Sequence, residues 1–153
     1  MKHLLIIYHS QSGKTAAMAH AIRRGAMHPD IESVDVRMRI AADAGPCDLF
    51  WCDAVIFATP ENFGYMAGAM KDFFDRTFYP CQGRLEGMPF AVVVGAGNDG
   101  TGALGALRRI VRGFPLKEMQ ESIVCNGPLD ENVLSRCEEL GATMAAGLEI
   151  GMF

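Results

Sequence analysis

Short apolar runs that alternate with helical patterns constrain the fold of this chain more than any other feature. Five runs have the residues of β-strands, at positions 3–8, 33–40, 54–58, 90–94 and 121–125. The first, third and fourth are almost continuously apolar, which is typical of strands that are covered on both faces. The sequence therefore predicts an α/β fold with one doubly wound, five-stranded parallel sheet.

Apolar residues recur at helical spacing in three of the segments between or after these runs. The three stripes are Met66, Met70, Phe73, Phe74 and Thr77; Leu104, Leu107, Ile110, Val111 and Phe114; and Val133, Cys137, Leu140, Met144 and Leu148. Another helix is predicted from near Gly13 to a point before Pro29. Trp51 precedes the third run, so we expect it to pack in the core and not against a ligand.

Length and composition indicate one ordinary globular domain, residues 1–153. The net charge of -4 argues against a nucleic-acid partner, which needs a concentrated basic face. Arg108, Arg109 and Arg112 share one predicted helix, where we expect a solvated face. No apolar run approaches the roughly 20 residues of a membrane span. The five cysteines include no C-x-x-C pair, so we expect no metal site, reduced thiols and a cytoplasmic location.

The loop Ser10-Gln11-Ser12-Gly13-Lys14-Thr15 follows the first strand and leads into the first helix. Its three hydroxyls and the amides at the start of the helix suit a single terminal phosphomonoester. The alternative is an ordinary helix cap by Ser12, which explains one hydroxyl but not three.

A loop for nucleoside triphosphates is the other reading of Gly13-Lys14-Thr15. That motif needs a glycine at position 8, where this chain has Tyr8. No apolar strand ends in an aspartate that could bind magnesium. We therefore favour a monophosphate.

Two more unusual loops follow the third and fourth strands. Residues 59–65 combine a proline, a glycine and two aromatic side chains, which suits the flank of a flat ring; the alternative is that the aromatics only cover the sheet edge. Residues 95–102 formally match the dinucleotide fingerprint G-x-G-x-x-G. That fingerprint follows the first strand of its unit and has an acidic residue at the end of the next strand, and this chain meets neither condition. We favour a loop whose backbone lets the polar edge of a ring come close.

The chain resembles the flavodoxin-like family, and within it the short flavodoxins and the NAD(P)H-dependent FMN or quinone reductases. "IIYHSQSGKTAAMAHAI" is similar to the family's opening strand, phosphate loop and helix, and "VIFATPENFGYMAGAMKDFFDRT" resembles the T-P-x-x-F-G-x-M segment of the reductases. The resemblance implies a parallel sheet of strand order 2-1-3-4-5 with FMN at the switch point of that order.

The resemblance also implies a binding role for three groups of residues. The phosphate of FMN would contact Ser10, Gln11, Ser12, Gly13, Lys14 and Thr15. The ring system would contact Thr59, Pro60, Glu61, Asn62, Phe63 and Gly64. Its pyrimidine edge or ribityl chain would border Gly95, Ala96, Gly97, Asn98, Asp99 and Gly100.

Two details of these roles concern single residues. The Gly64 carbonyl would accept a hydrogen bond from N5–H of the reduced ring. Lys14 has two alternatives, since many family members lack a lysine there: it neutralises part of the phosphate charge, or it extends into solvent.

Two functions agree with this resemblance. The first is an oxidoreductase that passes hydride from NADH or NADPH through FMN to a quinone or a similar small acceptor, with no obligatory catalytic side chain. The second is a flavodoxin-type electron carrier that docks on a redox partner protein. The resemblance implies no membrane partner, and a homodimer is one alternative for the oligomeric state.

Overall fold

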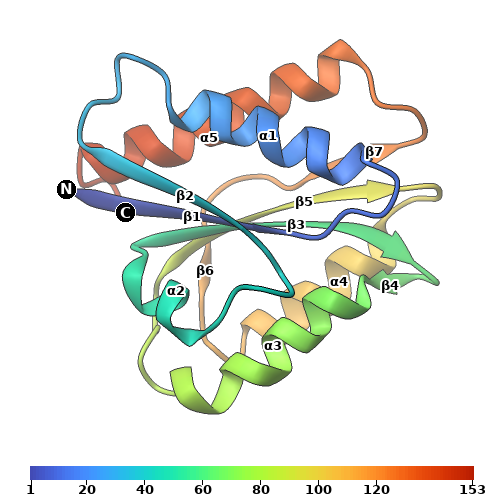
Figure 1. The fold of residues 1–153 in the computed structure, drawn as a ribbon, viewed down its shortest axis with the longest axis horizontal. Coiled ribbons are helices and arrows are strands. Elements are labelled where there is room, and N and C mark those ends of the chain that lie inside the picture. The colour runs from blue at the N-terminus through green and yellow to red at the C-terminus, as the bar shows by residue number, and fades with distance from the viewer.

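A central sheet with helices on both faces organises the chain (Figure 1). The computed structural model describes residues 1–153. The strands are β1 (Lys2–Tyr8), β2 (Val34–Ile40), β3 (Ala54–Asn62), β4 (Tyr65–Met66), β5 (Pro89–Ala96), β6 (Lys117–Glu118) and β7 (Ile123–Asn126). The helices are α1 (Lys14–Ala26), α2 (Pro46–Trp51), α3 (Gly68–Cys81), α4 (Thr101–Val111) and α5 (Glu131–Glu149).

The main path through the sheet runs β2-β1-β3-β5-β6, with every neighbouring pair parallel. β7 also pairs with β5 in parallel, and β4 pairs with β3 antiparallel. The sheet therefore has seven strands and not the predicted five, and its numbered order, 2-1-3-5-6, differs from the stated order 2-1-3-4-5.

Two local features cause this difference. The predicted third strand continues beyond Ala58 to Asn62 and turns back as β4, so residues expected in a loop belong to a hairpin. The predicted fifth strand is replaced by the short strands β6 and β7, both on β5. Short strands are usual at an open sheet edge, where a second partner is missing.

The central strands contribute side chains to both faces, as their continuous apolar runs predict. In β1, Leu5 and Ile7 belong to the core under α2, α3 and α4, whereas Leu4 and Ile6 belong to the core under α1 and α5. This alternation follows from the pleat of a strand. The doubly wound arrangement of an α/β fold is therefore confirmed, with helices on both faces (Figure 1).

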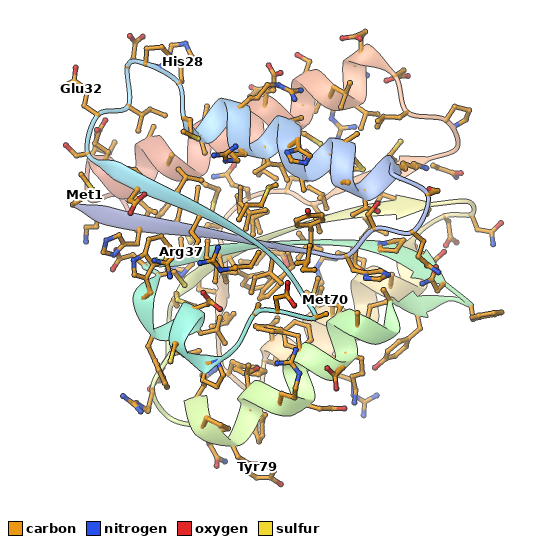
Figure 2. The ribbon with its side chains drawn as sticks, viewed as in Figure 1. Met1, His28, Glu32, Arg37, Met70 and Tyr79 are labelled. Carbon is orange, nitrogen blue, oxygen red and sulfur yellow. The ribbon has the colours of Figure 1, made fainter.

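The three apolar stripes lie toward the sheet, and almost all of their residues are buried. Figure 2 illustrates this on α3, where Met70 lies on the side of the sheet and Tyr79 projects at the other end of the helix. Met70 is fully buried and Tyr79 is exposed. The helix thus follows the amphipathic pattern predicted for it.

Trp51 does not lie in the centre of the core. It is only partly buried and packs at the margin of the α2–α4 core. The His3 ring stacks on it with centroids 4.4 Å apart, and the Arg37 guanidinium lies 3.9 Å from its centroid. Its role is nevertheless packing, as expected, because protein groups occupy the ring faces.

None of the five helices is both long and apolar enough to cross a membrane.

Candidate functional site

A cleft of about 570 Å³ lies at the carboxyl edge of the sheet, between the ends of β3 and β5 and the loops that follow β1, β5 and β7. In Figure 1 this edge is where β3, β5 and β7 end and α1 begins, opposite both chain termini. The lining residues are Gln11, Ser12, Lys14, Thr15, Pro60, Glu61, Asn62, Gly95, Ala96, Gly97, Gly127 and Pro128. Ligands of parallel α/β sheets bind at this kind of edge.

The loop after β1 presents free hydrogen-bond donors at the start of α1. Ser10 Oγ accepts from the N–H groups of Gly13 and Ala16, so this hydroxyl is the cap of the helix. The backbone N–H groups of Ser12, Lys14 and Thr15 donate to no group of the chain. Unpaired amides at a helix N-terminus, together with the positive end of the helix dipole, favour an anion.

Thr15 and Gly95 determine how closely the first and third loops approach each other. Thr15 lines the cleft and is only 2% exposed. A Cβ atom at Gly95 would lie 3.1 Å from Thr15 Oγ1, a tight contact. Glycine at position 95 therefore leaves space for this hydroxyl at the floor of the cleft.

The last three residues of β3, Pro60, Glu61 and Asn62, form one side of the cleft. Thr59 lies beneath it and is fully buried; its hydroxyl donates to the Pro60 carbonyl and accepts from the Ala67 N–H. Thr59 therefore braces the hairpin and does not line the cleft.

Two contacts connect this side of the cleft to its neighbours. Glu61 Oε2 accepts from the Ala103 N–H at 3.0 Å, so Glu61 caps the first turn of α4. Asn62 Nδ2 donates to Gln11 Oε1 at 2.6 Å, which joins the hairpin to the first loop. The two predicted binding loops are thus in direct contact.

Phe63 and Gly64 form the tip of the β3–β4 hairpin. Both have positive φ, 53° and 71°, as a two-residue hairpin turn requires. This conformation is uncommon for phenylalanine, whose side chain is fully exposed. The Gly64 carbonyl lies against Gly102, where a Cβ atom would meet its oxygen at 2.0 Å. Neither residue lines the cleft in this arrangement.

Of the predicted loop 95–102, only Gly95 and Ala96, which end β5, and Gly97, which follows it, line the cleft. Asp99 instead accepts from the N–H and hydroxyl of Thr101 at the start of α4. The hydrogen bond from the Thr101 N–H, followed by that from its hydroxyl, lowers the pKa of Asp99. Asn98, Asp99 and Gly100 thus form the entry to α4 beside the cleft.

The Lys14 side chain does not extend into solvent, which was one of its two expected positions. It crosses from α1 to the ends of β5 and β7, where its ammonium donates to the carbonyls of Ala96 (3.0 Å), Cys125 (2.9 Å) and Gly127. The ammonium is therefore bound to main-chain carbonyls of the protein.

Ten of the eighteen predicted residues line the cleft together, and all three predicted loops contribute. The other eight lie beside the cleft. Ser10 and Gly13 are at the start of α1, Asn98, Asp99 and Gly100 are at the start of α4, Thr59 is buried under the hairpin, and Phe63 and Gly64 form the hairpin tip.

Sequence reasoning missed Gly127 and Pro128, which complete the cleft from the loop after β7. The sequence does contain a pattern that indicates a loop at these two residues. Asn126-Gly127-Pro128 is a turn sequence directly after the last predicted strand. The carboxyl ends of all parallel strands meet at one edge, so a fourth loop is expected there.

Residues 47–127 match the family model of NADPH-dependent FMN reductase. A protein named flavodoxin from Aquifex aeolicus is 29% identical over 102 residues, which cover 67% of this chain and 54% of that protein. A protein named NAD(P)H dehydrogenase (quinone) from Acidithiobacillus ferrooxidans is 36% identical over 113 residues, covering 61% and 56%. The chain thus spans about half the length of these two relatives.

Solved structures show the same fold over nearly the whole chain. An archaeal flavodoxin superposes with a TM-score of 0.80 at 23% identity, covering 95% of this chain and 98% of that one. The flavodiiron core of a Synechocystis protein superposes with a TM-score of 0.84 at 21% identity, covering 98% and 36%. Together with the family match, these similarities show that the chain belongs to the NADPH-dependent FMN reductase family of flavodoxin-like proteins.

Proposed function

We propose that this chain is an FMN-dependent oxidoreductase that takes hydride from NADH or NADPH and delivers it to a quinone or a similar small acceptor. FMN is the cofactor that membership of this family indicates. The observation that carries the proposal is the cleft, in which unpaired amides of Ser12, Lys14 and Thr15 lie beside open, glycine-rich walls.

The residues of the cleft suit the separate parts of FMN. Its phosphate matches the amides of Ser12, Lys14 and Thr15 and the neighbouring hydroxyls, since a dianion is stabilised by several N–H and O–H donors at a helix start. Its ring system matches the space between the segment 60–62 and the segment 95–97, whose residues Gly95, Ala96 and Gly97 have small side chains or none.

When bound, FMN supplies the hydride and electron transfer, and the protein supplies position and electrostatics. In this chain the floor of the cleft is formed by backbone and small residues, and Glu61 is the one carboxylate that lines it. Its Oε2 is already bound to the Ala103 N–H, which directs the carboxylate toward α4. We therefore assign Glu61 to the positioning of α4 and name no general acid or base.

An electron carrier is the second candidate, because one of the two relatives is named flavodoxin and the other NAD(P)H dehydrogenase (quinone). The fully exposed Phe63 beside the cleft is compatible with contact to a partner protein. The net charge of -4 gives only a weak field for docking by charge.

Spectroscopy on the purified protein tests both parts of the proposal. Incubation with FMN and removal of excess should leave about one FMN per chain, seen by its visible absorption. Anaerobic addition of NADH or NADPH should then bleach this absorption without another protein. Bleaching that requires an added reductase protein would support the carrier instead, and failure to retain FMN would refute both.

Thr15→Val tests the phosphate site, since it removes the hydroxyl and keeps the shape. Loss of a hydrogen bond to a charged group costs about 1.5–3 kcal/mol, so the affinity for FMN should fall roughly tenfold or more. Riboflavin, which lacks the phosphate, should bind both proteins equally, and Thr15→Ser should retain most of the affinity. Fluorescence titration measures all three. An unchanged FMN affinity would remove Thr15 from the site.

A further inference from the structure

Lys14 combines an unfavourable position in its helix with an unusually complete set of partners. It is the first residue of α1, where the positive end of the helix dipole repels a cation. Its ammonium has three N–H donors, and three backbone carbonyls accept from it. No donor remains for another ligand.

Two of the three carbonyls lie at the end of the short strand β7, and the third lies at the end of β5. β7 has four residues and pairs only with β5. Cys125 lies in β7 and Gly127 just beyond it, so their carbonyls are at the open end of an edge strand. Ala96 ends β5, and its carbonyl accepts from both the Lys14 ammonium and the Gly127 N–H.

The path of the Lys14 side chain depends on a glycine. A Cβ atom at Gly95 would lie 3.6 Å from Lys14 Cδ and 3.7 Å from Cε, so the lysine stem runs directly over this residue. The stem and ammonium thus connect α1 with the loops after β5 and β7. The end of β5 and these two loops supply one wall of the cleft, namely Gly95, Ala96, Gly97, Gly127 and Pro128.

We propose that Lys14 is a positioning residue, which fixes the loops after β5 and β7 as one wall of the cleft and does not neutralise the phosphate of the ligand. This inference rests on the proposed binding of FMN, and it assigns the Lys14 ammonium to the carbonyls of Ala96, Cys125 and Gly127 and not to the phosphate. Removing the ammonium should therefore disturb the wall and leave the phosphate contacts in place.

Two variants separate the roles. Lys14→Met keeps the stem and removes the charge, whereas Lys14→Arg keeps the charge but brings a planar guanidinium that does not match three converging carbonyls. A positioning role predicts that both variants lose affinity for FMN and for riboflavin by the same factor, about tenfold, as expected when hydrogen bonds to a charged group are lost. Lys71→Met, on the exposed face of α3, is the control and should bind as the unchanged protein does.

If Lys14→Met lost affinity for FMN alone and Lys14→Arg restored it, the ammonium would act on the phosphate and the proposal would be overturned. Unchanged affinity for both ligands in Lys14→Met would overturn it as well.

Hydrogen exchange without any flavin provides a test that does not depend on the proposed function. The Gly127 amide, which donates to Ala96, should exchange at least about tenfold faster in Lys14→Met and Lys14→Arg, while amides of β1 keep their protection. Equal protection of Gly127 in all proteins would contradict the proposal. If the unchanged protein binds neither flavin but this difference appears, the proposed function fails and the positioning role stands.

Discussion

The helices on the two faces of the sheet pack against it in different ways. On the α2–α4 side, aromatic rings fill the space: Phe74 lies with its ring centroid 5.2 Å from that of Phe57, 5.5 Å from Phe73 and 5.7 Å from Phe114. All four rings are at least 97% buried. Large side chains therefore set the distance between α3, α4 and the sheet.

On the α1 and α5 side, none of the 20 buried core residues is aromatic. The two helices instead contact each other through backbone. A Cβ atom at Gly25 would lie 1.8 Å from the Glu138 carbonyl oxygen, and one at Gly141 would lie 1.9 Å from that of Ile22. The stability of the α2–α4 side is therefore expected to depend on keeping its large side chains, whereas that of the α1–α5 side depends on adding no side-chain volume at its glycines.

The largest effect is expected from Phe74→Ala, which leaves a cavity among the three rings. It should lower the free energy of unfolding by about 3–5 kcal/mol, measured by urea denaturation. Phe74→Leu should lower it much less, because most of the volume remains. A loss below about 1 kcal/mol for the alanine variant would show that the ring layer relaxes to fill the space.

Gly141→Ala tests the other layer by adding a single methyl group. The new Cβ atom must displace α1, and we expect a loss of about 1–3 kcal/mol or more in the free energy of unfolding. Gly105→Ala is the matched control, since this helical glycine of α4 has no atom within 4 Å of its added Cβ. There the substitution should stabilise the protein by about 0.5–1 kcal/mol. If both substitutions changed the free energy of unfolding in the same direction, the proposed difference between the layers would be contradicted.

Each layer also contains a buried thiol that responds to alkaline pH. Burial raises the pKa of Cys52 in the α2–α4 core to about 12, and burial raises that of Cys137 in the α1–α5 core to about 11, from 9.0. The unfolded chain releases these protons first, so the stability is complete below pH 9.0 and is lost as the pH rises toward the folded values.

For Cys52 the loss should reach about 1.4 kcal/mol per pH unit. Urea denaturation just below and well above pH 9.0 measures it. Cys52→Ala should show a smaller dependence than the unchanged protein. Equal slopes would mean that this thiol ionises in the folded protein as easily as in the unfolded chain.

The smallest effects concern one ion pair in each layer, partly buried for Arg108–Glu118 and exposed for Arg24–Glu138. Arg108 of α4 donates twice to Glu118, at 2.8 and 2.7 Å, whereas Arg24 of α1 donates once to Glu138 of α5, at 3.0 Å. Double-mutant cycles should give coupling energies below about 1 kcal/mol for both, larger for the two-bond pair. A larger value for Arg24–Glu138 would show that the close helix contact strengthens its pair.

The sequence predicts the layers of the fold well, because strand and helix periodicities are local properties. Leu4 to Ile7 read as a strand covered on both faces, and Val133, Cys137, Leu140, Met144 and Leu148 read as one helix stripe; all are buried as expected. The β3–β4 hairpin was missed because its turn places Phe63 at positive φ, where glycine or asparagine is the usual signal.

The candidate site is predictable to a similar degree. Strand ends and glycine-rich loops locate the cleft, because parallel topology brings them to one edge. Lys14 escaped prediction because a long, flexible side chain selects its partners in three dimensions: Cys125 and Gly127 are more than 100 residues away. The buried position of Thr59 escaped prediction for the same reason, because its hydrogen bond with the Ala67 N–H exists only once the hairpin has formed.

The glycine contact between α1 and α5 has a consequence for synthesis of the chain. The ring layer is built from residues before position 115, so it can assemble while the ribosome still holds the remainder. Among the five helices of this fold, α1 is synthesised first and its partner α5 last. Until then the face of α1 that carries Gly25 is without its cover, and nascent chains are most exposed to aggregation and to chaperones on that side.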